Sequence, residues 1–175
     1  MIFNENKDFY PTPKALAEKM CEYLDGKEEY VLEPSAGKGD LVDALRKIVG
    51  NIDMCESDET LHAVLSSKYA KETLEKEKAA LREEERNLER KMYVYNRETE
   101  KYENTLTEEE EKRFREVRKE LEYFQKDGTL RLVAKDFLSY QTWKKYDAIV
   151  MNPPFSEGAA HLLKAISLMR YGGKI

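Results

Sequence analysis

Short apolar segments that alternate with helical periodicity constrain the fold of this 175-residue chain most strongly. The apolar segments have the length of strands and lie at residues 30–33, 51–56, 130–137 and 146–151. Amphipathic helical spacing is found at residues 12–26, 40–50 and 157–169, and Thr12-Pro13 has the character of a hydroxyl-capped helix start. Strands that alternate with helices predict an α/β fold with a mainly parallel sheet.

Polar residues mark the end of every predicted strand. The carboxyl ends of parallel strands meet at one edge of the sheet, where ligands bind. A carboxylate there can accept the hydroxyls of a ribose, or it can simply begin a helix. A carboxylate next to an aromatic ring can bind an adenine. The residues concerned are Glu33, Glu56 with Asp58, Asp136 with Phe137, and Asn152.

Two short motifs stand directly after predicted strands. Residues 34–39, Pro-Ser-Ala-Gly-Lys-Gly, form a small-residue loop in which two glycines allow a tight turn and a close backbone approach to a ligand. Residues 152–155, Asn-Pro-Pro-Phe, combine two fixed φ angles with two missing backbone donors. This second motif predicts a stiff, extended corner that holds the Asn152 side chain and the Phe155 ring in place. A simple strand-ending turn is the alternative interpretation.

Residues 65–128 differ in composition from the rest of the chain. They contain no proline and no glycine before Gly128, and more than half of residues 71–126 are charged. Apolar residues recur every seven positions and then at 3-4-3 spacing, which predicts two helices in a projecting antiparallel hairpin with a break near residues 92–96. The positions are Leu74, Leu81, Leu88, Tyr95 and Tyr102, followed by Phe114, Val117, Leu121 and Phe124.

The motifs together resemble those of the S-adenosylmethionine-dependent N6-adenine DNA methyltransferases. The resemblance is carried by FYPTPKALAEKM, VLEPSAGKGDLV, DMCESD, AKDF and NPPF, in that order, and covers residues 8–64 and 129–175. It implies a Rossmann-like class I methyltransferase core, formed by residues 1–64 and 129–175, with an inserted helical hairpin at 65–128. It also implies S-adenosylmethionine as the cofactor and methyl transfer to adenine in DNA, as in restriction–modification or phage modification systems.

The resemblance carries site roles over to matching positions. The catalytic residues are expected to be Asn152, Pro153, Pro154 and Phe155. The cofactor is expected to be bound by Tyr10, Thr12, Glu33, Pro34, Ser35, Ala36, Gly37, Gly39, Glu56, Asp58, Asp136 and Phe137.

These roles suit the chemistry of adenine N6, whose lone pair is delocalised into the ring. The Asn152 side-chain oxygen and the Pro153 carbonyl can accept its two N–H bonds, so that positioning and electrostatics carry the reaction without a strong base. Phe155 would stack on a target base that has left the duplex. Similar tetrads occur in rRNA guanine-N2 and protein-glutamine methyltransferases, which remain alternatives. A non-catalytic module that binds a partner through the hairpin is another.

The sequence stops at Ile175, where members of the family continue with further strands and a DNA-recognition region. We therefore expect the C-terminal strands to be missing and the fourth strand to be an exposed edge. DNA would be bound through a region outside this chain. The hairpin or the exposed strand offers a surface for a protein partner or for self-association, and the chain alone is expected to be inactive.

Composition excludes several other classes. The net charge of −5 argues against a generally basic nucleic-acid binder. Cys21 and Cys55 are too few for a disulfide framework, and no Cys/His cluster has the spacing of metal ligands. His62 and His161 are expected to be surface or satisfied histidines. Without a signal peptide or a long apolar run, we expect a cytoplasmic protein with no membrane span and no metal.

Overall fold

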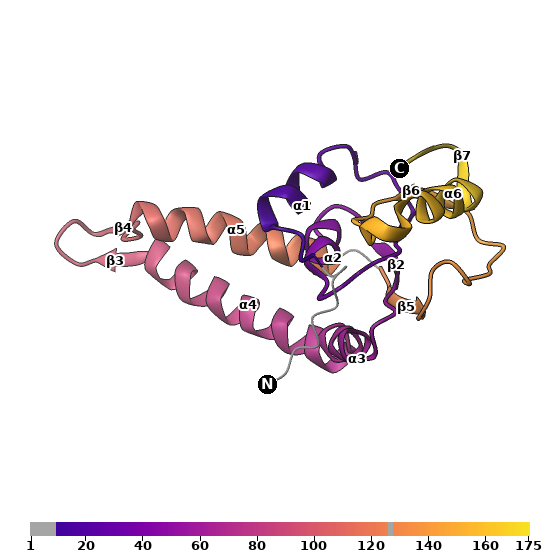
Figure 1. Cartoon of the computed structure of the whole chain (residues 1–175). Coiled ribbons are helices and arrows are strands. Elements are labelled where there is room, and N and C mark those ends of the chain that lie inside the picture. Colours follow the sequence, from indigo (N-terminus) through magenta and orange to yellow (C-terminus); the bar gives the residue numbers. More distant parts are fainter. Residues whose placement is uncertain (1–9, 126–127) are drawn as a thin grey trace. The chain divides into compact units, whose positions relative to one another are not determined.

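The computed structural model describes residues 10–125 and 128–175. The chain divides into two compact units. We call Met1–Tyr69 together with Asp127–Ile175 the core unit, and Ala70–Lys126 the insert unit. Figure 1 traces the elements of both units along the chain.

The core unit is built on a five-stranded sheet within the described residues, and every neighbouring pair of its strands is parallel. The strand order is β5-β2-β1-β6-β7, which is the doubly wound order in which the winding reverses between β1 and β6. The strands are β1 (Tyr30–Glu33), β2 (Asn51–Cys55), β5 (Leu130–Ala134), β6 (Tyr146–Ile149) and β7 (Met169–Lys174). The predicted α/β class with a mainly parallel sheet is therefore confirmed.

The expectation of an unpaired fourth strand is wrong. β7 pairs with β6 in the registers Tyr146↔Met169 and Ala148↔Lys174. Its glycines and exposed side chains gave little strand periodicity in the sequence. Ion pairs hold it in place, from Arg170 to Asp147 at 2.6 Å and from Lys174 to Glu28 at 2.6 Å. The edge strand on this side is β7 rather than β6.

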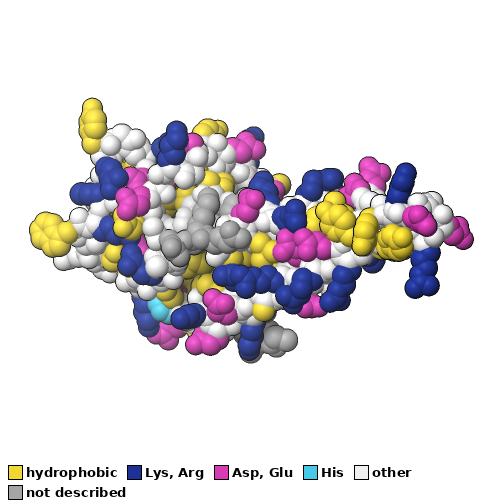
Figure 2. Space-filling model, turned by 180° about the vertical axis from the view of Figure 1, so that it is seen from behind, with side chains coloured by type: hydrophobic (Ala, Val, Ile, Leu, Met, Phe, Trp, Pro, Cys, Tyr) yellow, Lys and Arg dark blue, Asp and Glu magenta, His cyan; other side chains and the backbone are white. Residues whose placement is uncertain are grey.

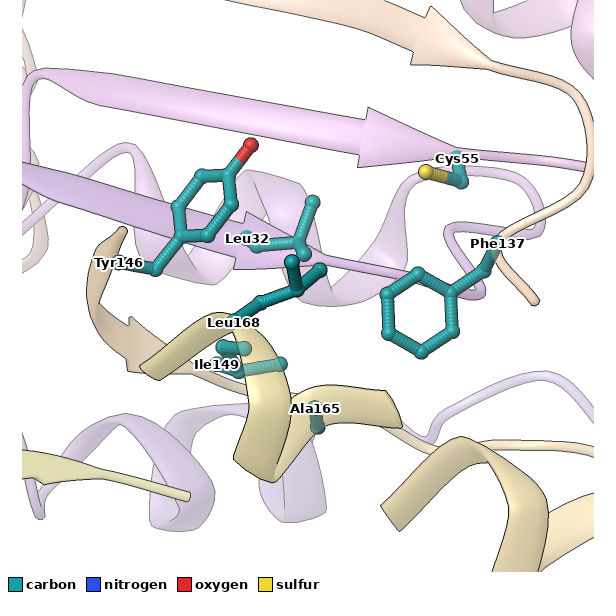
Figure 3. Packing of buried hydrophobic residues seen from close by; sticks show 7 residues of the cluster. All are labelled: Leu32, Cys55, Phe137, Tyr146, Ile149, Ala165 and Leu168. Atoms are coloured by element: carbon teal, nitrogen blue, oxygen red, sulfur yellow. The ribbon is translucent and has the colours of Figure 1, made fainter. Parts of the chain in front are cut away.

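Helices pack around the sheet and bury its apolar side chains. They are α1 (Lys14–Cys21), α2 (Asp40–Leu45), α3 (Glu59–Lys68) and α6 (Gly158–Leu168), with a 3₁₀ turn, η1, at Phe155–Glu157. Ala165 and Leu168 of α6 pack on side chains of β1, β2 and β6, together with Phe137 (Figure 3). Both cysteines are free and buried, and burial raises the pKa of Cys55 to about 12. Thr12 does not cap α1, because Pro13 occupies the N-cap position.

A buried carboxylate ties three strands of the sheet together. Asp53 of β2 is only 1% exposed and accepts hydrogen bonds from Arg131 of β5, from Lys144 and from Tyr146 of β6. Burial alone would raise the pKa of Asp53, but the three donors outweigh it and hold the pKa below its usual value. The ion pair therefore contributes stability that is present at neutral pH and is lost as the pH falls through that lowered pKa.

The insert unit is an antiparallel helical hairpin with its own small core. α4 (Lys71–Met92) and α5 (Glu108–Gln125) run side by side and are joined by a ribbon of two strands, β3 (Val94–Asn96) and β4 (Lys101–Glu103) (Figure 1). Leu81, Val117 and Leu121 form the buried cluster. α4 ends at Met92, within the range 92–96 that the sequence left open for a break, and the heptad positions Tyr95 and Tyr102 lie on strands rather than on a helix.

Deletion of the insert tests the independence of the core unit. Replacing residues 71–126 with a short Gly-Ser linker should leave a cooperative thermal transition, because the two units have separate buried clusters and loop length affects stability only weakly. The melt is followed by circular dichroism. A broad, non-cooperative melt of the shortened chain would show instead that the insert is part of the core's folding unit.

Candidate functional site

A cavity of about 330 Å³ lies at the carboxyl edge of the sheet, where the winding reverses. Most of the predicted site residues line it, although they come from five separate stretches of the chain. They are Tyr10, Thr12, Pro34, Ser35, Ala36, Gly37, Glu56, Asp58, Asp136, Phe137, Asn152 and Pro154. Four predicted residues do not line it: Glu33, Gly39, Pro153 and Phe155.

The glycine-rich loop is held in a defined shape after β1. The Ala36 N–H donates to the Cys55 carbonyl at 2.9 Å, and Gly37 and Gly39 both have positive φ, at 57° and 86°. The Tyr69 hydroxyl lies 3.0 Å from the Gly39 carbonyl, and a side chain at Gly39 would collide with it. Gly39 therefore contacts Tyr69 on the side of the loop away from the cavity, which it does not line.

Glu33 lies beneath the loop, fully buried. One carboxyl oxygen accepts the Ser35 N–H at 2.9 Å, while the other has no hydrogen-bond partner among the described residues. The Ser35 hydroxyl is likewise buried and unpartnered within the described chain. Burial raises the pKa of Glu33 to about 8, and the neighbouring charge of Glu56 adds to the effect. Two buried polar atoms without partners sit directly under a cavity lining, an arrangement that favours a polar ligand there.

Glu56 and Asp58, at the end of β2, have different roles. Glu56 is buried and accepts N–H bonds from Gly37 at 2.7 Å and from Asp58 at 2.8 Å, so it fixes the loop after β1 to the end of β2. Burial raises its pKa. Asp58 caps α3 by accepting from Thr60 and Leu61. The helix-start interpretation therefore holds for Asp58, while Glu56 is the carboxylate that bridges two loops.

Asp136 and Phe137 follow β5 and lie side by side on the cavity wall. The Asp136 carboxylate accepts from the N–H groups of Leu138 and Ser139, and its hydrogen bonds with Ser139 lower its pKa most. Phe137 is almost fully buried, and its ring lies 5.4 Å from that of His161 on α6. An apolar ring and an ionised carboxylate thus flank the same part of the cavity.

Asn152 is tied to the N-terminal segment across the cavity. Its side-chain amide donates to the Tyr10 carbonyl at 3.3 Å and to the Thr12 hydroxyl at 3.1 Å. A backbone carbonyl can only accept, so the amide nitrogen must face Tyr10 and the side-chain oxygen must face the other way. Two segments that are distant in the sequence therefore fix the direction of the Asn152 oxygen.

Phe155 lies at the rim of the site. Its ring is 73% exposed and packs at 53° against the ring of Tyr10, with centroids 5.0 Å apart. The two prolines hold it there, since Pro154 is extended at φ −52° and ψ 130° and begins the turn η1. A large, exposed ring held by a stiff backbone is suited to contact a flat ligand from outside the cavity.

Ten lining residues were missed by the sequence. They are Pro11, Lys38, Asp40, Leu41, Ser57, Leu61, Lys135, Ser156, Glu157 and His161. Most are direct neighbours of predicted residues, so a window of one or two positions around each motif would have found them. His161 gave no such signal. Its Nδ1 lies 3.1 Å from the Glu157 carbonyl, so it is a satisfied histidine that also lines the cavity.

No group of three or more His, Cys, Asp or Glu side chains in the described part of the chain could hold a metal ion. None of the helices in those residues combines the length and the apolar character that crossing a bilayer requires.

Comparison with known families gives a partial match. Residues 92–171 match the model of the Methyltransferase small domain family, a stretch that includes Asp136 and residues 152–155 but not the glycine-rich loop. The chain has no significant match among curated proteins.

Solved structures share the fold at low sequence identity. An rRNA methyltransferase, AviRa from Streptomyces viridochromogenes, has a TM-score of 0.56 and 14% identity, over 94% of this chain and 73% of that one. The glycopeptide N-methyltransferase MtfA has a TM-score of 0.52 and 12% identity, over 95% of this chain and 53% of that one. A putative RNA methyltransferase from Pyrococcus horikoshii has a TM-score of 0.50 and 18% identity, over 91% and 58%.

These likenesses establish the Rossmann-like fold of methyltransferases for this chain. The family match over residues 92–171 agrees with S-adenosylmethionine as the cofactor and with methyl transfer as the class of reaction. The chain spans little more than half the length of two of these structures.

The pH dependence of stability tests the environment of Glu33. Its raised pKa means that the folded state holds a proton which the unfolded state has released above its ordinary pKa of 4.5. Unfolding free energy should therefore fall as the pH rises from about 5 to about 8, by at most about 1.4 kcal/mol per pH unit. Glu33→Gln, which cannot ionise, should remove this part of the slope. Urea unfolding at a series of pH values measures it, and identical slopes for the two proteins would contradict the assignment.

Proposed function

We propose that this chain forms the cofactor-binding and catalytic core of an S-adenosylmethionine-dependent methyltransferase that modifies the N6 amino group of adenine in DNA. The proposal is supported by the fold, by the family match over residues 92–171, and by the order of the sequence motifs. The observation that carries it is the orientation of the Asn152 side chain by Tyr10 and Thr12 at the rim of the cavity.

The residues present fit the cofactor. Its methionine part carries a cationic amino group and a carboxylate, which suit the cavity floor above Glu33 and Ser35, where two buried polar atoms have no partner within the described chain. Glu56 would accept the ribose hydroxyls, and Asp136 with Phe137 would hold the adenine, so that polar and apolar groups alternate along the cavity wall. Thr12 would close the cavity from the N-terminal side. When bound, S-adenosylmethionine supplies an electrophilic methyl group on a sulfonium.

The corner at residues 152–155 would hold the target base. The Asn152 side-chain oxygen and the Pro153 carbonyl would accept the two amino hydrogens of adenine, which favours charge development on nitrogen. Phe155, exposed at the rim, would stack on the extruded base. Proton loss from the methylated nitrogen needs no strong base, because the amine becomes acidic as the new bond forms. The protein contributes position and fixed acceptors.

The chemical identity of the methylated product distinguishes adenine in DNA from the alternative substrates. Transfer to guanine N2 in rRNA or to a glutamine side chain in a protein would use the same corner with a different planar amine. The solved RNA and rRNA methyltransferases share this fold at less than 20% identity, so their substrates do not decide the question. A non-catalytic module would bind the cofactor without turnover. DNA, total rRNA and cell protein, each incubated with radiolabelled cofactor, distinguish these cases by the methylated product.

Substitution of Asn152 tests the catalytic role. Asn152→Ala in the full-length protein should lower kcat by about 10²–10³ because one fixed acceptor is lost. The cofactor Kd should stay nearly unchanged, since the cofactor is assigned to the loops after β1, β2 and β5. Methyl transfer to adenine-containing DNA, with analysis for N6-methyladenine, gives kcat, and calorimetry gives Kd. Wild-type turnover in this variant would contradict the catalytic role of Asn152 and would show that residues 152–155 only end the strand rigidly.

Thr12 is assigned a positioning role that a pair of variants can test. Thr12→Val keeps the shape of the side chain but removes the acceptor of the Asn152 amide, so kcat should fall by about tenfold. Thr12→Ser, which keeps the hydroxyl, should restore most of it. A change in the KM for the cofactor, with kcat constant, would assign Thr12 to cofactor binding alone.

A further inference from the structure

The strand ribbon of the insert unit and the residue that ends α4 expose three tyrosines. Tyr93, Tyr95 and Tyr102 are 65%, 50% and 70% exposed. Tyr95 and Tyr102 are paired across the two strands, with ring centroids 5.4 Å apart in an edge-to-face arrangement. Figure 2 shows hydrophobic side chains gathered near this end of the hairpin. A solvent-exposed aromatic group of this kind marks a contact surface.

The ribbon holds its tyrosines on a stiff support. The Asn96 side-chain oxygen accepts from Glu98 and Thr99, which forms the turn, and Glu103 accepts from the side chains of Asn96 and Thr99. Because side chains alternate along a strand, Lys101 and Glu103 lie on the face opposite Tyr102. The tyrosine face is therefore separated from the Glu103 carboxylate.

Charges in the hairpin are sorted between the helix interface and the outer surface. Acidic side chains of α4 face the arginines of α5, as Glu84 bonds to Arg113, and Glu85 and Glu89 bond to Arg118. The negative charge of α4 is thus partly neutralised within the hairpin.

Basic side chains of α4 form a row that starts beside α5, where Lys78 and Arg82 line a hollow with Arg118 and Glu122. The row continues with Arg86 and Arg90, which are exposed. Lys78, Arg82, Arg86 and Arg90 recur every fourth residue, so neighbours are about 6 Å apart along the helix. Arg82 and Arg90 have no ion pair with any described residue, and Arg86 pairs only with Glu83 among them. In Figure 2, Lys and Arg side chains lie along both edges of the hairpin, with Asp and Glu side chains among them. Like charges at i and i+4 oppose helix formation, so the row does not serve the stability of α4.

We propose that the insert unit binds single-stranded DNA, with the basic row of α4 (Lys78, Arg82, Arg86 and Arg90) on the phosphates and the ribbon tyrosines (Tyr93, Tyr95 and Tyr102) stacked on bases. A row of cations that leads to exposed aromatic rings is the combination that single-strand binding uses. A protein partner could bind the aromatic rings, but it would give the basic row of α4 no role. The proposal rests on the proposed function only in naming DNA as the substrate.

The test measures binding of a fluorescein-labelled single-stranded oligonucleotide by anisotropy at several salt concentrations. Tyr95→Ala/Tyr102→Ala should weaken binding at least about tenfold, while Tyr95→Phe/Tyr102→Phe, which keeps the rings, should bind nearly as the wild type does. Arg82→Gln/Arg86→Gln/Arg90→Gln should lower the slope of log K against log salt by about 2. The matched control is Lys112→Gln/Arg115→Gln/Lys119→Gln on α5, which changes the net charge equally and should leave the slope close to that of the wild type.

The outcomes separate this proposal from the proposed function. If the arginine triple variant and the control triple variant lose the same amount of salt dependence, the effect comes from net charge alone. That result would contradict the proposed role of the basic row of α4. Unchanged DNA affinity in the tyrosine variants, with a loss of self-association in sedimentation, would overturn it in favour of a protein contact. If the variants behave as expected but the wild type forms no N6-methyladenine, the surface stands and the proposed reaction fails. If N6-methyladenine forms and the variants bind DNA as the wild type does, the proposed reaction stands and the proposed binding surface fails.

Discussion

The parallel pairing of β1 with both β2 and β6 is the constraint on which the rest of the structure depends. It brings the ends of strands that are distant in the sequence to one edge, in the registers Glu33↔Met54 and Leu32↔Ile149. The loop after β1 then meets Glu56, and the corner at Asn152 meets the N-terminal segment. Both contacts require β1 to lie between β2 and β6 in the sheet. The reversal of winding at β1 leaves a crevice that no crossover covers.

Acidic side chains at different depths of the same sheet have opposite electrostatic environments. Asp53 is surrounded by cationic and hydroxyl donors and keeps a lowered pKa. Glu33 lies one register position further along, beside Met54 at the carboxyl edge, and it has one backbone donor and a raised pKa of about 8. The first arrangement stabilises the folded sheet by itself. The second leaves polar capacity unused in the folded protein, which is the usual signature of a binding site rather than of a structural ion pair.

The sequence predicted the strands and the site to different degrees. The strand ends, the glycine-rich loop and the N-terminal motif together identified about half of the cavity lining, because the carboxyl ends of parallel strands meet at one edge of the sheet. The sequence could not assign Asp58 to a helix cap or place Glu33 under the loop, since both depend on side-chain direction. β7 was missed because its six residues include two glycines and few apolar side chains, and its stability comes from pairing and from Arg170 and Lys174. The bond from Asn152 to Thr12 joins segments that no local pattern connects.

The antiparallel form of the insert has a consequence for the order in which the chain folds. β5 must find β2 after the whole insert has been synthesised, and Ile52 pairs with Leu130 across that length. If the insert were an unstructured loop, this pairing would be a slow, non-local event, although the loop would affect stability only weakly. A hairpin whose helices close on each other through ion pairs such as Glu84–Arg113 forms from local contacts and returns the chain close to its starting point. The early folding of the insert would thus shorten the effective loop between β2 and β5, and charge sorting on its helices would influence how fast the sheet assembles.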